Sequence, residues 1–176
     1  MHVSWNGFGH GLPQQGTASV TLMLSIGSLA PAISLPDSHD STQTLASFAG
    51  RQVFVYFYPR ANTPGCTQQG CAIQTALSAG EISDVVVLGI SPDKPQAFAK
   101  FAEKYGFEFH LLSDVDHHVA EAYGAWALKK NYGKEYMGIV RSAVLIDEVG
   151  KVVKVWPAVS PKATVPELIS ALAGNA

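Results

Sequence analysis

The sequence predicts an α/β domain with a central mixed β-sheet flanked by helices, and three observations lead to this prediction. Two short runs of β-branched and aromatic residues, Val53–Phe57 and Asp84–Ile90, are typical of strands buried on both faces of a sheet. A segment with helical features follows each run. Two further apolar runs flank residues 148–150, which is the pattern of a β-hairpin, and a last helical segment follows. This order of elements is typical of an α/β sandwich.

The segment after the first strand carries the signals of a helix N-terminus. Thr63 and Pro64 fit an N-cap followed by a proline in the first turn, and Gly80 fits a C-terminal stop. We therefore expect a helix over Cys66–Ala79, in which only Gly70 is unfavourable. The first of the two cysteines then lies in the first helical turn.

The remaining elements follow from periodicity and turn residues. Phe98, Phe101 and Tyr105 recur at helical spacing, which predicts an amphipathic helix over Pro95–Tyr105. The other expected elements are a strand at Phe109–Leu112, a helix at Val119–Tyr123, hairpin strands at Arg141–Asp147 and Lys151–Trp156, a helix at Val165–Ala173, and a small N-terminal β element from Ala32–Leu35 and Thr44–Phe48.

Composition and charge exclude several classes of protein. The chain has 176 residues, 47% hydrophobic and 15% charged, which is a globular composition of about one domain. A net charge of −2 gives no electrostatic reason to expect a nucleic-acid partner, and no apolar run is long enough for a membrane helix. Two cysteines are too few for a disulfide-stapled secreted fold. We expect a soluble, cytoplasmic protein with reduced thiols.

We expect the N-terminal stretch to lie outside the folded domain. No Lys or Arg precedes Arg51, so the basic region of a signal peptide is missing. We expect residues 1–22 to form a flexible extension and residues 23–176 to form the domain, with Met23 as an alternative start.

Cys66 is the candidate nucleophile. A thiol reacts as the thiolate, so a reactive cysteine needs groups that stabilise the anion. The helix N-terminus supplies free N–H groups and a favourable dipole, and a cation could supply the rest. Arg141, which opens a buried strand, is the best candidate for that cation, although it could equally lie at a strand edge in solvent. On composition alone, two buried cysteines acting as small apolar residues are the simpler reading.

Two loop residues could support this cysteine. The hydroxyl of Thr63 could cap the helix by accepting a hydrogen bond from the Cys66 N–H, which is the more frequent role of such a threonine. Pro59 would fix the backbone that enters the loop and shield the sulfur from water.

The spacing of the two cysteines has a geometric consequence. Cys66 and Cys71 are five residues apart, which on an ideal helix separates their Cα atoms by about 8–9 Å. A disulfide needs roughly 4.4–6.8 Å. If the two cysteines form a disulfide, the first turns of the helix must unwind, and Gly70 would ease that change.

A group of acidic and histidine side chains follows the third strand. Asp and His in a turn before a helix are usually solvated, so we expect neither a metal ion nor another cofactor here. The group comprises Asp114, Asp116, His117 and His118.

The segment Phe57–Cys71 resembles the active-site segment of peroxiredoxins, in the subfamily called peroxiredoxin Q or bacterioferritin comigratory protein. The family pattern P-x-x-x-T-x-x-C falls on Pro59, Thr63 and Cys66, and the subfamily pattern T-P-G-C-T-x-Q-x-C ends at Cys71. The resemblance covers about Ser25–Gly174 and continues through Gly89–Lys94, Leu111–Asp114, Tyr123–Trp126, Tyr136–Gly138 and Arg141–Asp147.

This resemblance implies a thioredoxin-like fold and a peroxidase that needs no haem, flavin or metal. In the family mechanism Cys66 attacks the peroxide and becomes a sulfenic acid, while Thr63 and Arg141 hold the peroxide oxygens. Pro59 completes the set of site residues. Cys71 then resolves the sulfenic acid, and thioredoxin or a similar dithiol reduces the disulfide. The implied substrates are hydrogen peroxide and organic hydroperoxides, and we expect a monomer with a role in antioxidant defence.

The sequence departs from the family pattern at one place. After the resolving cysteine the family often has an aromatic residue or Leu, then Arg-Asp, whereas this chain has Ile73-Gln74-Thr75. The departure concerns the charge pairing of the helix and the surface that a reductant would contact.

Two other functions stay open at this point: a redox sensor whose disulfide is recognised by a partner protein, and a holdase-like binding protein.

Overall fold

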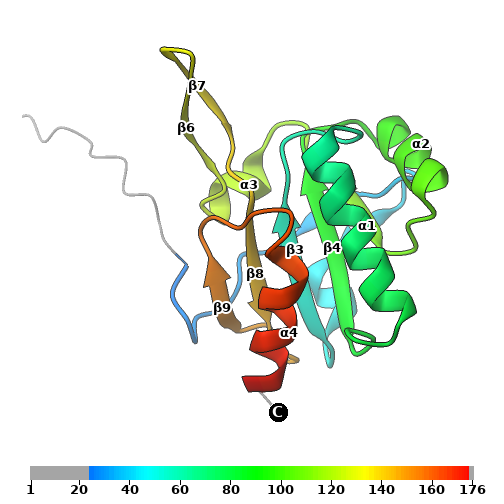
Figure 1. Cartoon of the computed structure of the whole chain (residues 1–176). Coiled ribbons are helices and arrows are strands. Elements are labelled where there is room, and N and C mark those ends of the chain that lie inside the picture. The colour runs from blue at the N-terminus through cyan, green and yellow to red at the C-terminus, as the bar shows by residue number, and fades with distance from the viewer. Residues whose placement is uncertain (1–23, 175–176) are drawn as a thin grey trace, which may run out of the picture.

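The computed structural model describes residues 24–174 and has a five-stranded mixed sheet at its centre, in the order β5-β4-β3-β8-β9 (Figure 1). The expected extension at residues 1–22 and the alternative start at Met23 lie outside the described residues. The elements are β1 (Ser34–Pro36), β2 (Thr42–Thr44), the 3-10 helix η1 (Leu45–Phe48), β3 (Gln52–Phe57), α1 (Pro64–Ser78), β4 (Val85–Ser91), α2 (Pro95–Tyr105), β5 (His110–Ser113), α3 (His118–Ala122), β6 (Trp126–Asn131), β7 (Lys134–Ile139), β8 (Ser142–Ile146), β9 (Val152–Trp156) and α4 (Thr164–Gly174).

Strand β3 is the centre of the sheet. It pairs in parallel with β4 on one side and antiparallel with β8 on the other, and β5 and β9 complete the two edges. Residues 53–57 are all buried, because helices or loops cover both faces of the strand. The predicted α/β sandwich around a mixed sheet is therefore confirmed.

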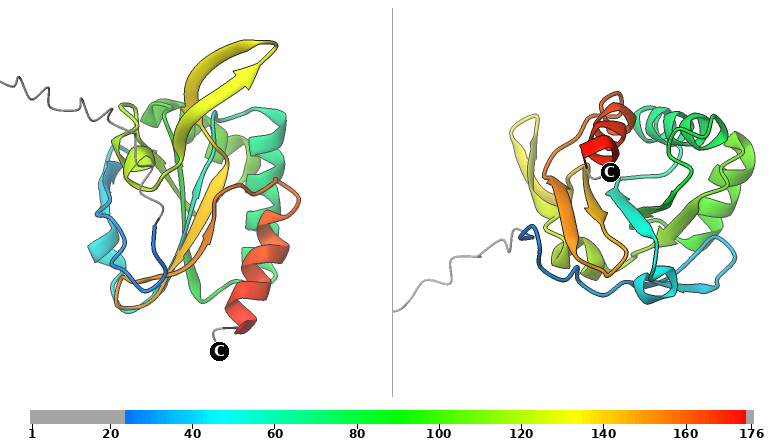
Figure 2. Two further views of the ribbon diagram at one scale, coloured as in Figure 1. Left: turned by 90° about the vertical axis from the view of Figure 1, so that its left-hand side faces the viewer. Right: turned by 90° about the horizontal axis from the view of Figure 1, so that it is seen from below.

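Alternate side chains of β3 enter two separate cores. Phe54 and Tyr56 pack with α1, α2 and α4 on one face, whereas Val53, Val55 and Phe57 pack with α3 and the N-terminal segment on the other. Figure 2 shows this division, with α4, α1 and α2 along one side of the sheet and residues from the N-terminal segment along the opposite side. The longest helix, α1, has 15 residues, and no helix in residues 24–174 is long and apolar enough to cross a membrane.

Most expected elements lie where the sequence places them. Helix Pro95–Tyr105 has the predicted bounds, and the helix expected from Cys66 begins at Pro64 and ends at Ser78. The N-terminal β element is only partly as predicted, because residues 45–48 form a 3-10 helix and not a strand. The Thr44 hydroxyl accepts a hydrogen bond from the Ser47 N–H and thereby caps this helix.

The hairpin of β6 and β7 has no counterpart among the predicted elements. Its turn residues, Tyr132 and Gly133, both have left-handed φ angles, of 50° and 77°, as a two-residue hairpin turn requires. The hairpin projects from the body of the molecule (Figure 1), so most of its side chains are exposed and its sequence lacks a core-facing pattern. Hydrophobic alternation, the usual signal of a strand, is weak for that reason.

We predict that Gly89→Ala destabilises the protein by about 1–3 kcal/mol, because it overpacks the core. Gly89 pairs with Tyr56 across β3 and β4, and a Cβ atom on Gly89 would lie 2.8 Å from the Tyr56 ring. The ring cannot easily move, since it stacks between Phe54 and Tyr58. Urea unfolding of the purified variants measures the effect. Gly174→Ala is the control, because a Cβ at that position has nothing within 4 Å; equal stability of the two variants would contradict the prediction.

Candidate active site

Cys66 lies in the first turn of α1, at the end of the loop that leaves β3. Thr63 is the N-cap in extended conformation and Pro64 is the first helical residue, as the sequence predicts. The first helical hydrogen bond joins the Thr67 N–H to the Thr63 carbonyl at 2.8 Å, so Cys66 lies at the positive end of the helix dipole. Its side chain is only 2% exposed, and it is a free thiol.

Arg141 is brought to Cys66 by the pairing of β3 with β8. Phe57, the last residue of β3, is opposite Ser142, the first residue of β8, so the residues just beyond them meet at this edge of the fold. The Arg141 Nη2 donates a hydrogen bond to the Cys66 Sγ at 3.3 Å. Arg141 is therefore not a solvated strand-edge residue, and its guanidinium lies directly beside the sulfur.

Gln69 is a site residue that the sequence reasoning missed. It is fully buried, and its Oε1 accepts a hydrogen bond from the Arg141 Nη1 at 2.6 Å. Its Nε2 donates to the Thr164 Oγ1 of α4 at 2.8 Å. A residue three positions after Cys66 lies on the same helix face, which is the one signal that could have identified it.

Thr63 is the N-cap residue, but the prediction that its hydroxyl accepts a hydrogen bond from the Cys66 N–H is wrong. The helix has no side-chain cap, because the Thr63 hydroxyl turns back into the loop and donates to the Arg60 carbonyl at 2.9 Å. The N-terminal N–H groups of α1 are thus not occupied by this hydroxyl, and they point to the same end of the helix as the sulfur.

The loop between β3 and α1 is fixed by Asp93. The Asp93 Oδ2 accepts hydrogen bonds from the Ala61 N–H at 2.7 Å and from the Ser91 hydroxyl at 2.6 Å. The Ser113 hydroxyl donates to the Asp93 carbonyl at 2.5 Å, which ties the same residue to β5. Pro59 is half-buried in this loop, so the backbone on both sides of it is held in place.

Two buried tyrosines lie beneath the site. Burial raises the pKa of the Tyr56 hydroxyl, and the nearby Cys66 adds to the effect while Arg141 opposes it. Burial also raises the pKa of Tyr58, whose hydroxyl has no hydrogen-bond partner among residues 24–174. Both hydroxyls therefore stay protonated, and neither can act as a base towards the thiol.

Cys71 lies further along the same helix and is half-buried. It lines a shallow depression of about 500 Å³ together with Gln74, Thr75, Ser78, Ala79 and Tyr105. Because α1 is unbroken from Pro64 to Ser78, the two cysteine Cα atoms are about 8–9 Å apart, too far for a disulfide in this conformation.

The segment around Cys71 shows how α1 is held in place. The Phe107 ring covers Gly70 so closely that a Cβ there would be 2.6 Å from its Cζ. Gln74, at a position where the family pattern has Arg, binds Glu108 twice: its Oε1 accepts from the Glu108 N–H at 2.8 Å and its Nε2 donates to the carboxylate at 3.2 Å. The Thr75 hydroxyl donates to the Cys71 carbonyl at 2.9 Å. Uncharged side chains thus make hydrogen bonds at the positions where the family pattern has charged residues.

The acidic and histidine group is only partly assembled. Ligand atoms of Asp114, Asp116 and His118 lie within 4.8 Å of one another, and the hydrogen bond that the His118 ring donates to the Asp116 carboxylate raises the pKa of His118. His117 points elsewhere and stacks on Trp126 at 3.8 Å. The buried Asp114 carboxylate accepts hydrogen bonds from two N–H groups of α3, at 2.9 and 3.3 Å. Its structural role is therefore to cap that helix.

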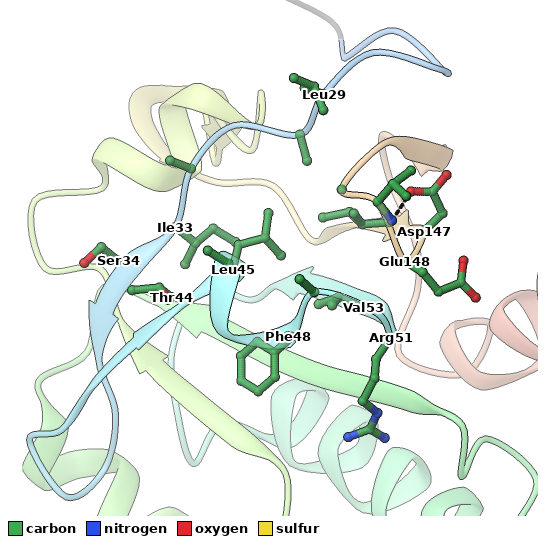
Figure 3. Close-up of a pocket in the computed structure, with 17 residues that line it drawn as sticks. Leu29, Ile33, Ser34, Thr44, Leu45, Phe48, Arg51, Val53, Asp147 and Glu148 are labelled. Atoms are coloured by element: carbon green, nitrogen blue, oxygen red, sulfur yellow. Dashed lines mark hydrogen bonds between the residues drawn. The ribbon is translucent and has the colours of Figure 1, made fainter.

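A large apolar cavity lies away from the two cysteines. It has a volume of about 520 Å³, and Ile33, Leu45, Phe48 and Val53 line it, with Arg51 at its edge (Figure 3). It is at the start of β3, whereas the loop to Cys66 leaves the other end of that strand. None of the site residues that the sequence predicts lines this cavity.

Comparisons with known proteins show to which family the chain belongs. Residues 26–155 match the AhpC/TSA family. The chain is 41% identical to peroxiredoxin Bcp of Bacillus subtilis over 151 residues, which cover 86% of this chain and 96% of that protein. It is 47% identical to peroxiredoxin Bcp of Escherichia coli over 133 residues, which cover 76% of this chain and 85% of that protein.

Solved structures of peroxiredoxin Q have the same fold. A mutant of the Xanthomonas campestris protein aligns with a TM-score of 0.76 and 33% identity, over 82% of this chain and 92% of that one. A mutant of the Xylella fastidiosa protein aligns with a TM-score of 0.79 and 29% identity, over 86% and 97%. The predicted thioredoxin-like fold is confirmed. The chain belongs to the AhpC/TSA family, as a peroxidase of the Bcp/peroxiredoxin Q group.

Proposed function

We propose that this chain is a thiol peroxidase in which Cys66 is the peroxidatic cysteine and Cys71 the resolving cysteine. The observation that carries the proposal is the contact of the Arg141 guanidinium with the buried Cys66 Sγ at the N-terminus of α1. Helix dipole and cation act on the same sulfur, which is the environment that a reactive thiolate requires. Hydrogen peroxide and organic hydroperoxides are the proposed substrates.

The first step oxidises the sulfur by two electrons. The Cys66 thiolate attacks one peroxide oxygen, the O–O bond breaks, and the other oxygen leaves as an alkoxide or hydroxide that takes up a proton. Cys66 becomes a sulfenic acid. Arg141 stabilises the negative charge as it moves from sulfur to the leaving oxygen, because its guanidinium already lies beside the sulfur. For Thr63 to donate a hydrogen bond to the peroxide, its hydroxyl must leave the Arg60 carbonyl.

The second step joins the two cysteines. The Cys71 thiol condenses with the sulfenic acid, an S–S bond forms, and water leaves. Because an intact α1 separates the cysteines, its first turns unwind before this step. Thioredoxin or a similar dithiol then reduces the disulfide by thiol–disulfide exchange and is itself oxidised. The cycle serves antioxidant defence and redox homeostasis in a reducing compartment such as the cytoplasm, and the chain acts as a monomer.

We expect Cys66→Ser to lose peroxide turnover to the level without enzyme, because serine cannot form a sulfenic acid. Consumption of NADPH with thioredoxin, thioredoxin reductase and hydrogen peroxide measures turnover. Full turnover by the variant would exclude Cys66 as the peroxidatic residue. A wild-type chain that is oxidised once but does not turn over would favour a redox sensor over a recycling peroxidase.

Cys71→Ser should separate the two steps. We expect one rapid round of Cys66 oxidation, followed by loss of thioredoxin-driven cycling, because no thiol is left within the chain to form the disulfide. Stopped-flow fluorescence and mass detection of the sulfenic acid follow the first step, and NADPH consumption follows the cycle. Undiminished cycling would remove the resolving role of Cys71.

Arg141→Lys should slow Cys66 oxidation by about 10- to 100-fold. This is the rate factor that corresponds to the free energy of one charge-assisted hydrogen bond. A lysine keeps the positive charge but cannot donate to Cys66 and Gln69 in parallel, as the two guanidinium nitrogens do. Stopped-flow oxidation rates measure the effect. Arg51→Lys makes the same change at an exposed residue before the start of β3 and is the matched control, and a wild-type rate in Arg141→Lys would show that charge alone suffices.

A further inference from the structure

We propose that Thr164, the first residue of α4, is a positioning residue of the peroxide site that acts on Arg141 through Gln69. The proposal rests on the proposed role of Cys66 as the peroxidatic cysteine. It assigns a function in the reaction to the C-terminal helix α4.

A continuous chain of hydrogen bonds joins α4 to the sulfur. The Thr164 hydroxyl donates to the Ser160 carbonyl at 2.8 Å and accepts from the Gln69 Nε2 at 2.8 Å. The Gln69 Oε1 accepts from the Arg141 Nη1 at 2.6 Å, and the Arg141 Nη2 donates to the Cys66 Sγ at 3.3 Å. Gln69 and Thr164 are 95 positions apart in the sequence, yet α1 and α4 lie side by side in the fold (Figure 1).

The direction of these bonds is set by Thr164. A hydroxyl has one proton, and that of Thr164 is used on the Ser160 carbonyl, so the oxygen can only accept from Gln69. Gln69 must therefore turn its NH₂ group towards Thr164 and its carbonyl oxygen towards Arg141. The flipped amide would place N–H donors against the guanidinium, which has only donors of its own. Thr164 thus selects the amide orientation that holds Arg141.

The burial of Gln69 and Thr164 keeps the Gln69 amide in this orientation. Gln69 is 0% exposed and Thr164 is 1% exposed, so water cannot readily replace either partner. The guanidinium is also confined on the other side, since a Cβ on Gly65 would lie 3.2 Å from the Arg141 Nη2 and 3.5 Å from the Pro161 ring. Pro161 belongs to the loop that enters α4. The same loop holds the Arg141 backbone, because the Val159 N–H donates to the Arg141 carbonyl at 3.0 Å.

Thr164→Val tests the proposal, because valine has nearly the same shape but no hydroxyl. We expect the second-order rate of Cys66 oxidation by hydrogen peroxide to fall about three- to tenfold, the worth of one neutral hydrogen bond. Thr164→Ser should recover most of the rate.

A double-mutant cycle distinguishes positioning from general support of the fold. In the background of Gln69→Ala, Thr164→Val should have no further effect on the oxidation rate, because its partner is absent. Leu168→Val, a change of a fully buried residue in the same helix, should lower the stability of the protein but leave the oxidation rate unchanged. Additive effects in the cycle, or an equal loss of rate in Leu168→Val, would overturn the proposal.

The same measurements distinguish a failure of the proposed function from a failure of the role of Thr164. If wild-type Cys66 is not oxidised by peroxide, the proposed function fails. If the wild type reacts and Thr164→Val reacts at the same rate, only the role of Thr164 fails. Should Thr164→Val not fold, NMR of the wild type decides, because the Gln69 side-chain NH₂ protons should exchange slowly with solvent in the reduced protein. Exchange as fast as that of an exposed glutamine would exclude the hydrogen bond to Thr164.

Discussion

The contact between the Arg141 guanidinium and the Cys66 sulfur is the interaction on which the rest of the site depends. A buried ion pair is tolerable only where further hydrogen bonds satisfy both partners. Antiparallel pairing of β3 with β8 brings Arg141 to the end of β3, the start of α1 supplies the dipole, and Gln69 binds the second guanidinium nitrogen. Gly65 leaves room for the guanidinium. The sheet order therefore matters for chemistry because it places the cation and the helix N-terminus at the same point.

Helix α1 has two conflicting tasks in the proposed cycle. Intact, it presents Cys66 to Arg141; unwound, it lets Cys66 reach Cys71. Gly70 lowers the helix propensity next to Cys71, but the Phe107 ring lies against it and opposes the loss of helix. Beyond Cys71, the two hydrogen bonds between Gln74 and Glu108 hold the second half of α1 to the segment before β5. Unwinding of the first turns also breaks the hydrogen bonds that join Gln69 to Arg141 and Thr164. The departure from the family pattern at Gln74 lies beyond Cys71 and does not involve these hydrogen bonds.

The sequence predicts local features well and long-range contacts poorly. Strands β3 and β4, helix α2 and the start of α1 follow from periodicity, proline and N-cap residues within a few positions. The direction of the Thr63 hydroxyl was wrong because capping propensity does not reveal a competing carbonyl in the loop. Gln69 was missed because its partners, Arg141 and Thr164, lie 72 and 95 positions away. Arg141 was named as a candidate cation from its place at the start of a buried strand, with a solvated position left open, and the family resemblance added a role beside Cys66.

The size of a cavity is a poor guide to the reactive site in this protein. The apolar cavity at the start of β3 has the dimensions of a ligand pocket, but neither cysteine lines it and its one arginine, Arg51, is exposed. The surroundings of Cys66 need little space, because the reacting group of any hydroperoxide is only two oxygen atoms. What they need is a stabilised sulfur and donors aimed at the oxygen that leaves. Cys66, Arg141 and the N-terminus of α1 meet that requirement, so the electrostatic arrangement supports the proposed active site where cavity volume does not.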